Sequence, residues 1–332
     1  MYVFADSLSD MGALKEMTGG KLPPSPYWNG RFSSGPVWVE YLALLTDFNL
    51  YNKGVGGATV DVNNQVVLDF TNNPLIVSGS QAQITYFKAN NPKYASAATR
   101  EKDVLLFEAG TNDFTVQAPN IASGRLGMET FVDNLIDTMI GQLEQLRQIG
   151  FKNIFVCQMA PIQASPFMKL VNMTTTMEKT ADLFNQKLPK KLEAWSSSAS
   201  DLNSVVVAEV ATLVEIALTS KEVFKALGIT NYDKPCINGD TSGFAAAENK
   251  LVEVLKYSYD APNSQVCDDP SKYLFFDVLH PTERLHRMLG YVAFEMIGAI
   301  QQGSQLEITE ASILEIIKKY NLGTPVSKPA KI

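Results

Sequence analysis

The sequence predicts an α/β fold in which a five-stranded parallel sheet lies between two layers of helices. Short apolar runs alternate along the chain with longer amphipathic segments, and this alternation is typical of strands joined by crossover helices. The run Val104–Phe107 is apolar at every position, as expected for a strand that is buried on both faces. In such sheets the functional site lies beyond the carboxyl ends of the strands.

Five apolar runs are the predicted strands, and they cover residues 2–4, 47–51, 104–107, 154–157 and 205–208. Three of these runs are followed by small, polar or glycine residues. Ser7 comes shortly after the first run, Gly57 after the second and Asn112 after the third. Because parallel strands have their carboxyl ends at the same edge of a sheet, we expect these three residues to meet there.

Helices are predicted between the strands and after the last one. Pro36 stands at a favourable position to start a helix over residues 37–45. A segment over residues 175–195 is expected to bend or break at Pro189. The clearest helix ends at Gly150, because apolar residues before it recur at steps of three and four: Phe131, Leu135, Ile136, Met139, Ile140, Leu143 and Leu146. Further helices are predicted over residues 81–89, 282–300 and 307–320.

The chain has 332 residues, of which 45% are hydrophobic and 19% charged, so it can bury a sizeable core. Its formal charge of -7 disfavours binding to nucleic acid or to an anionic membrane surface, since both need clustered Lys and Arg. No apolar run approaches the ~20 residues of a membrane span, and no leader precedes the first strand. We expect one domain over residues 1–322, with loops over 61–80 and 228–273, and a loose tail over 323–332.

Ser7 is the candidate nucleophile, although a serine after a strand can also cap a turn. A nucleophilic serine needs a base and a carboxylate that orients this base. The chain contains only two histidines. His280 lies in a turn before a proline, whereas His286 falls within a predicted helix, where we expect a surface position. We therefore assign the base to His280 and its orienting group to Asp277, although a structural turn would use the same residues.

The third requirement is a set of donors for the oxyanion. Gly57 lacks a β-carbon, so a substrate carbonyl can approach its N–H, and the Asn112 amide can point at the same place. The Ser7 N–H would complete the set. Either glycine after the second strand could also be a plain turn residue.

His280 and His286 would lie about 240° apart around a helix, a poor arrangement for one metal ion, and we expect no cofactor.

Together these clusters resemble the sequence blocks of the GDSL, or SGNH, hydrolases. Residues 4–10 are similar to the first block, 52–58 to the second, 110–113 to the third and 277–281 to the fifth, in the family's order. Residues 30–42 are similar to the plant and fungal GDSL esterase/lipase branch, which includes fungal acetylesterases and bacterial haemolysin-like lipases. The resemblance implies the SGNH hydrolase fold, a three-layer α/β/α sandwich with flavodoxin-like strand order.

The resemblance also implies a serine ester hydrolase that works through an acyl-enzyme. Ser7, His280 and Asp277 would be its triad, and Ser7, Gly57 and Asn112 its oxyanion donors, acting on a small-molecule or saccharide ester. We expect short acyl groups, such as acetyl, because the sequence shows no lid helix or broad apolar patch.

One residue departs from the family motif, since Ala5 stands where relatives carry glycine before the Asp-Ser pair. A positive φ there would cost alanine about 1 kcal/mol, but we expect a negative φ. This departure is the basis of an alternative hypothesis, in which a weak or inactive hydrolase scaffold binds carbohydrate or another partner.

Three cysteines complete the sequence-based predictions. Cys157 lies in an apolar run and is expected to be a buried thiol. Cys236 and Cys267 flank a loop-rich stretch, and their spacing alone allows either a disulfide or two free thiols. The resemblance implies a bridge between them and a secreted protein, so we expect an oxidising compartment.

Overall fold

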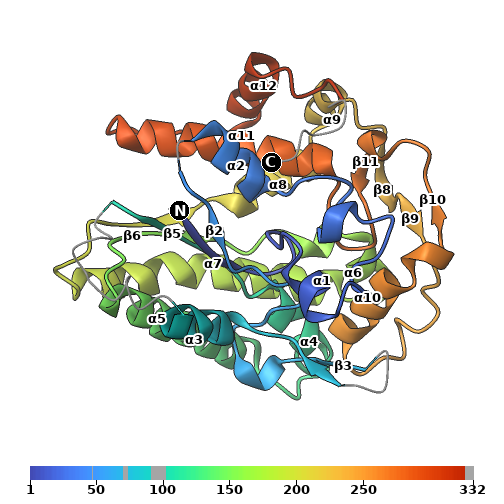
Figure 1. Ribbon diagram of the computed structural model, residues 1–332, viewed down its shortest axis with the longest axis horizontal. Helices are drawn as coiled ribbons and strands as arrows, with labels where there is room; N and C mark the ends of the chain where they lie inside the picture. The colour runs from blue at the N-terminus through green and yellow to red at the C-terminus, as the bar shows by residue number, and fades with distance from the viewer. Residues whose placement is uncertain (47, 70–73, 91–101, 326–332) are drawn as a thin grey trace.

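A sheet of five parallel strands forms the centre of the protein. The computed structural model describes residues 1–46, 48–69, 74–90 and 102–325. The strands are β1 (Tyr2–Ala5), β2 (Tyr51–Asn52), β5 (Val104–Glu108), β6 (Asn153–Cys157) and β7 (Ser204–Ala208). They lie in the order β2-β1-β5-β6-β7 (Figure 1). Numbered along the chain this is the order 2-1-3-4-5, so the predicted flavodoxin-like fold is confirmed.

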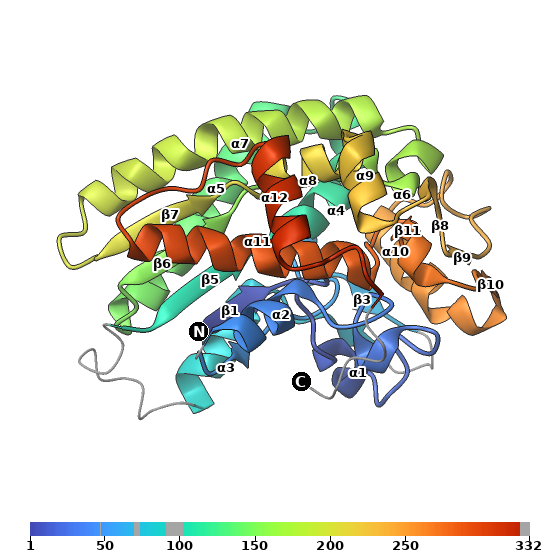
Figure 2. The same ribbon diagram turned by 90° about the horizontal axis from the view of Figure 1, so that it is seen from above.

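Two layers of helices cover the sheet, one on each face (Figure 1), and Figure 2 looks onto the layer that contains α11. One layer contains α3 (Ser80–Asn90), α4 (Thr111–Ala122), α5 (Met128–Gln148) and α7 (Thr174–Ser197). The other contains α2 (Trp38–Leu45), α8 (Val210–Thr219) and α11 (Glu283–Gln301). Successive side chains of β1 point to opposite faces of the sheet. Tyr2 and Phe4 pack in the hydrophobic core on one face, and Val3 and Ala5 pack in the core on the other.

The remaining elements are short and lie around the sheet. The helices are α1 (Ala13–Met17), α6 (Pro166–Leu170), α9 (Lys221–Leu227), α10 (Lys250–Tyr259) and α12 (Glu310–Lys319). Single 3-10 turns cover Trp28–Gly30, Val62–Asn64, Ile162–Ala164, Ala261–Asn263 and Pro270–Lys272. Three two-stranded ladders pair β3 (Val67–Leu68) with β4 (Leu75–Ile76), β8 (Asn231–Pro235) with β11 (Tyr273–Phe275), and β9 (Ile237–Asn238) with β10 (Gln265–Val266).

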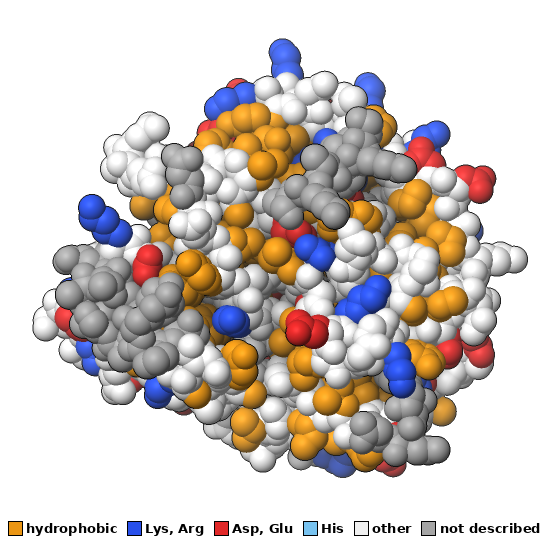
Figure 3. Space-filling view, in the orientation of Figure 1, with side chains coloured by type: hydrophobic (Ala, Val, Ile, Leu, Met, Phe, Trp, Pro, Cys, Tyr) orange, Lys and Arg blue, Asp and Glu red, His pale blue; other side chains and the backbone are white. Residues whose placement is uncertain are grey.

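The surface mixes both signs of charge. On the face shown in Figure 3, acidic and basic side chains are dispersed among apolar groups. Among the described helices, none combines the length and the apolar character that a membrane crossing requires.

Three sequence-based predictions about the fold need correction. The second strand comprises only Tyr51–Asn52, because the ladder to β1 starts where the Tyr51 N–H donates to the Met1 carbonyl. Phe48 and Leu50 from the predicted strand instead pack on the core outside this ladder, and residue 47 lies outside the described residues. Helix α7 continues through Pro189 as one element, so the predicted break is wrong, and the alternative of a bend stays a prediction.

The third correction concerns the segment 228–273, which was predicted to be rich in loops, with no helix assigned, and contains α10. Asn249 caps this helix by accepting hydrogen bonds from the N–H groups of Leu251 and Val252. Its buried face packs on the core through Leu251, Val254 and Leu255.

The start of the predicted C-terminal tail is held in place. Carbonyls of Gly323 and Thr324 accept hydrogen bonds from Arg284 and Arg287 of α11. Residues 326–332 of the predicted tail lie outside the described residues.

A disulfide joins Cys236 and Cys267, as the family resemblance implied. The two residues are 31 positions apart, and the loop between them contains α10. Backbone bonds accompany the bridge, since the Cys267 N–H donates to the Cys236 carbonyl at 2.9 Å. Cys157 is a free, buried thiol, as predicted.

Loss of this disulfide should destabilise the fold. For the double variant Cys236→Ser/Cys267→Ser we expect the free energy of unfolding to fall by about 2–4 kcal/mol, because the unfolded chain regains the freedom of the closed loop. Urea unfolding of both proteins, with and without a thiol reductant, measures this. Addition of reductant should lower the stability of the wild type and leave the double variant unchanged. A wild-type stability that is insensitive to complete reduction would contradict the prediction.

Candidate active site

The loop after β1 presents a serine at the carboxyl edge of the sheet. Ser7 follows the strand by two residues and lies inside a turn that the Ser9 N–H closes by donating to the Asp6 carbonyl at 3.3 Å. The Leu8 N–H also donates to Asp6 Oδ1 at 3.1 Å. These two bonds fix the backbone from which the Ser7 side chain projects.

Ala5, where the chain departs from the GDSL motif, has an ordinary backbone. It is the last residue of β1 and pairs with Glu108 of β5. Among the described residues other than glycine, positive φ occurs only at Asn29, Asn172 and Asn321, so φ at Ala5 is not positive. The expectation from sequence is confirmed, and the alanine introduces no left-handed strain beneath Ser7.

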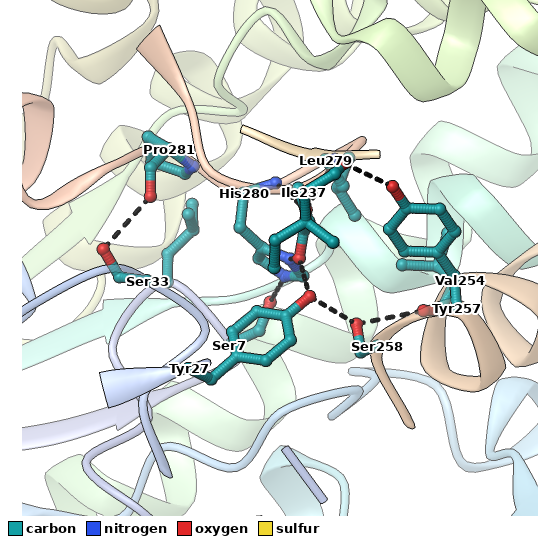
Figure 4. Close-up of polar contacts among 12 residues, drawn as sticks. Ser7, Tyr27, Ser33, Ile237, Val254, Tyr257, Ser258, Leu279, His280 and Pro281 are labelled. Carbon is teal, nitrogen blue, oxygen red and sulfur yellow. Dashed lines mark hydrogen bonds and ion pairs between the residues drawn. The ribbon is translucent and has the colours of Figure 1, made fainter. Parts of the chain in front are cut away.

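The structure brings Ser7, His280 and Asp277 together. His280 Nε2 lies 2.8 Å from Ser7 Oγ (Figure 4), and His280 Nδ1 lies 2.8 Å from Asp277 Oδ2. An ionised carboxylate can only accept a hydrogen bond, so Nδ1 carries the proton and Nε2 accepts from the serine hydroxyl. Ser7 is 6% exposed and His280 2%, so water has little access to these bonds.

Asp277 organises the turn that carries His280. Its Oδ1 accepts hydrogen bonds from the backbone N–H groups of Leu279 and His280, at 2.8 and 2.6 Å. Its Oδ2 accepts from the His280 ring and, at 2.6 Å, from the Tyr27 hydroxyl. Burial alone would raise the pKa of Asp277, but the charge of His280 and the hydrogen bonds from His280 and Tyr27 lower it below its ordinary value.

Tyr27 is a site residue that the sequence did not reveal. Its hydroxyl bonds Asp277 and lies 3.1 Å from Ser258 Oγ on α10 (Figure 4). Burial and the neighbouring charge of Asp277 raise the pKa of Tyr27 well above its usual value, so the phenol stays a donor. The residue stands 250 positions from Asp277, and no local pattern marks it.

Phe32 also went unrecognised, although it lies in the segment 30–42 that narrowed the family resemblance. Its ring lies against the His280 ring, with centroids 4.8 Å apart. A β-carbon at Gly56 would stand 2.2 Å from the Phe32 ring, so this glycine makes room for the contact. Next to it, Ser33 donates to the Pro281 carbonyl (Figure 4). Phe32 and Ser33, from the N-terminal part of the chain, thus hold the turn that carries His280 in place.

Gly57 and Asn112 lie close together at the same edge. The turn at Gly57 has a φ of +81°, a conformation that favours glycine, and it closes where the Ala58 N–H donates to the Val55 carbonyl. Asn112 is in the first turn of α4, and its amide donates to the Ala58 carbonyl at 2.8 Å. One of the two amide N–H bonds of Asn112 therefore fixes the side chain against the glycine turn.

Buried carboxylates hold this glycine loop. Asp10 Oδ2 accepts from the Gly56 N–H at 2.7 Å. Asp113 accepts from the N–H groups of Val60 and Asp61 and from the Asn64 amide, all within 3.0 Å. Burial is the main reason that the pKa of Asp113 is raised to about 7, although these donors oppose it.

A second pair of carboxyl groups lies beneath the serine loop. Glu108 accepts from the Ser9 hydroxyl at 3.0 Å, and the Trp38 indole N–H donates to the same hydroxyl oxygen at 3.0 Å. Burial, and then the charge of neighbouring Asp6, raise the pKa of Glu108 well above its usual value. Burial therefore favours the protonated form of Glu108 in the folded protein more than in the unfolded chain.

The predicted surface position of His286 is wrong. The residue is fully buried on α11, and neither ring nitrogen has a hydrogen-bond partner. Burial lowers the pKa of His286 to about 3, so the ring is neutral. Among the residues that the structure describes, no group of three or more His, Cys, Asp or Glu side chains is placed to hold a metal ion.

The comparison with protein families identifies the chain. The model of the GDSL-like lipase/acylhydrolase family matches residues 1–291. The chain belongs to this family. By its family, the chain is a carboxylic ester hydrolase. The sequence blocks around Ser7, Gly57, Asn112 and His280 all lie within the matched residues.

Individual relatives are distant. The thermolabile hemolysin of Vibrio parahaemolyticus is 26% identical over 88% of this chain, which spans 61% of the length of that relative. A GDSL esterase/lipase of Arabidopsis thaliana is 23% identical over 88% of this chain and 85% of its own length. Among solved structures, the native aryl esterase of M. smegmatis is 16% identical to this chain. The match covers 62% of this chain and 82% of the esterase chain, with a TM-score of 0.33.

The raised pKa of Glu108 should make stability depend on pH. The folded state keeps the Glu108 proton to higher pH than the unfolded chain, so the free energy of unfolding falls as pH rises above about 4.5, the ordinary glutamate pKa. The amide in Glu108→Gln has no such proton to lose. We expect the variant to gain stability relative to the wild type as pH rises above about 5, as measured by urea unfolding.

A matched control is Glu129→Gln on α5, because Glu129 is exposed. Its stability difference from the wild type should stay constant over the same pH range. Parallel stability curves for Glu108→Gln and the wild type would contradict the prediction.

Proposed function

We propose that the chain hydrolyses carboxylic esters through an acyl-enzyme formed on Ser7. The observation that carries this proposal is the chain of two 2.8 Å contacts from Ser7 Oγ through the His280 ring to Asp277. Ser7 attacks the ester carbonyl while His280 Nε2 takes its proton, and the imidazolium then gives this proton to the leaving alcohol. A water molecule repeats the sequence on the acyl-enzyme and releases the acid. Asp277 stabilises the charged ring and fixes its tautomer.

The oxyanion of each tetrahedral intermediate would be bound by the Ser7 N–H, the Gly57 N–H and the second amide N–H of Asn112. The left-handed turn at Gly57 and the position of Asn112 against Ala58 support this assignment. Such donors are effective because they are already oriented in a buried site and need no reorganisation during the reaction.

The alternative of an inactive scaffold that binds carbohydrate or another partner rested on Ala5. The ordinary backbone there and the short Ser7–His280 contact favour catalysis instead. The single-domain organisation over residues 1–322 stays a prediction. We also propose a secreted location, which the Cys236–Cys267 disulfide supports.

The sequence predicts short acyl groups such as acetyl, with saccharides among the alcohols, and both stay predictions. The low exposure of Ser7 supports a small group at the reacting carbonyl itself. A series of p-nitrophenyl esters of increasing acyl length tests the acyl part.

Replacement of the nucleophile should abolish turnover. With p-nitrophenyl acetate, we expect Ser7→Ala to lower kcat by ~10⁴-fold or more. Ser9→Ala removes a hydroxyl that contacts Glu108 rather than His280, and its kcat should stay within about tenfold of the wild type. A fluorophosphonate probe should label the wild type and not Ser7→Ala. Equal turnover by Ser7→Ala and the wild type, or a wild type that the probe fails to label, would refute the proposed function.

Removal of one oxyanion donor should slow the chemistry without preventing binding. We expect Asn112→Ala to lower kcat by about 10²–10³-fold with little change in KM, since the lost interaction is made in the transition state. The control is Asn120→Ala on the same helix, whose side chain bonds Gln117 and Arg125 instead. Steady-state kinetics on a soluble ester measures both variants. An Asn112→Ala enzyme within twofold of the wild type would remove Asn112 from the mechanism.

A further inference from the structure

A tyrosine from the N-terminal part of the chain bonds the carboxylate oxygen that faces the imidazole. The Tyr27 hydroxyl donates to Asp277 Oδ2 at 2.6 Å, and the same oxygen accepts from His280 Nδ1 at 2.8 Å. Tyr27 is thus one hydrogen bond away from the base.

The two oxygens of Asp277 are held by different parts of the chain. Oδ1 accepts from the backbone N–H groups of Leu279 and His280, which belong to the same turn as Asp277. Oδ2 accepts from two side chains, and Tyr27 is the one that comes from outside this turn. Loss of the phenol proton would leave the imidazole as the donor to Oδ2.

The phenol has little freedom to turn away from Asp277. Its ring is buried and lies edge-on against the rings of Phe276 and Phe32, with centroids 5.3 and 5.8 Å away. The backbone N–H of Tyr27 donates to the Pro24 carbonyl at 3.0 Å. Because both the ring and the backbone are fixed, the hydroxyl stays directed at the carboxylate.

A serine of α10 orients the phenol oxygen. Ser258 is fully buried, and its Oγ lies 3.1 Å from the Tyr27 oxygen (Figure 4). The single phenol proton is donated to Asp277, so Ser258 is the donor in its bond to Tyr27, and it shares its proton with the Val254 carbonyl at 3.1 Å. Hydrogen bonds that follow one another in one direction strengthen each other. The bond from Ser258 therefore makes the phenol a better donor to Asp277.

The phenol also affects how tightly the imidazole holds its second proton. A hydrogen bond to the ionised carboxylate of Asp277 stabilises this charge and weakens its attraction for the charged ring. Without the phenol, the His280–Asp277 pair would bind its proton more tightly, since the two groups titrate as a unit. The neutral base would then be present only at higher pH.

We propose that Tyr27 is a positioning residue for ester hydrolysis, which orients Asp277 and sets the pH above which His280 acts as the base. Ser258 supports it by holding the phenol oxygen. The inference rests on the proposed function and extends it to a residue that acts through the carboxylate.

The first test is the variant Tyr27→Phe, which removes one oxygen and keeps the ring. With p-nitrophenyl acetate, the acid limb of the pH profile of kcat/KM should move to higher pH by about half a unit or more. On the plateau, kcat should fall by about threefold to tenfold with little change in KM, because Asp277 orients the base rather than the substrate. An acid limb that stays in place or moves to lower pH would overturn the inference.

A matched control removes the same kind of bond away from the site. The Tyr320 hydroxyl donates to the carboxylate of Glu295 on α11. Tyr320→Phe should keep the pH profile and the kcat of the wild type. A shift of the acid limb equal to that of Tyr27→Phe would contradict the assignment.

Other titratable groups interact with the pair, and the comparison allows for them. Burial lowers the pKa of His286 to about 3 and raises the pKa of Tyr257 to about 12, so both groups stay neutral over the profile. Burial is also the main reason that the pKa of Asp6, which interacts with the charge of His280, is raised to about 6. Asp6 is present in the wild type and in every variant, so its titration does not produce a difference between them.

Ser258→Ala covers the case in which Tyr27→Phe does not fold. This variant weakens the bond from the phenol without removing it, so the acid limb should shift in the same direction by about half as much. An unchanged limb would overturn the inference. A wild type without turnover on any ester would instead refute the proposed function, whereas an unshifted limb in an active enzyme refutes only the assignment of Tyr27.

Imidazole nitrogen NMR follows the same proton without turnover. The chain has two histidines, and His286 stays neutral, so the ring that titrates is that of His280. The midpoint of this titration should lie at higher pH in Tyr27→Phe than in the wild type. Identical midpoints would overturn the inference even if the esters tested are poor substrates.

Discussion

The candidate site depends on one buried carboxylate. Asp277 accepts four hydrogen bonds, from two backbone N–H groups, the His280 ring and the Tyr27 hydroxyl. A carboxylate without these donors would be costly to bury, and its pKa would rise. With them it stays ionised, and the same bonds set the path of the backbone, the orientation of the imidazole and the position of the N-terminal loop that carries Tyr27. The hydrogen bonds to Asp277 therefore determine both the geometry of the site and the charge of its buried carboxylate.

Two more buried carboxyl groups accept several backbone hydrogen bonds at this edge of the sheet. Asp10 gathers the N–H groups at the start of α1 and that of Gly56, and Asp113 gathers those of the loop after Gly57. Asp10, from the loop after β1, and Asp113, from the first turn of α4, thus each bind the backbone on one side of Gly57, and they hold this loop in place. Phe32 adds a packing contact between the glycine turn and the histidine. A rim built in this way is preorganised before any substrate arrives.

The sequence predicted the parts of the molecule that local chemistry determines. Apolar runs located four of the five strands, and the polar and glycine residues after three runs placed Ser7, Gly57 and Asn112 at one edge, to which the family resemblance added His280. The sequence did not reveal Tyr27 and Phe32, which contact Asp277 and His280, or Ser258, which bonds Tyr27, because these contacts depend on packing between segments that lie far apart in the chain. His286 was misplaced because periodicity alone could not show that α2 covers its side of α11.

The separation of Ser7 and His280 in the sequence has a consequence for the folding of the chain. Ser7 follows the first strand of the chain, whereas its partner His280 comes 273 residues later. Contacts at such separation are costly in chain entropy. If the two residues act as proposed, a chain that ends before His280 has the serine without its base and should not hydrolyse esters. Ester hydrolysis would then report that the turn with His280 has docked against the loop after β1.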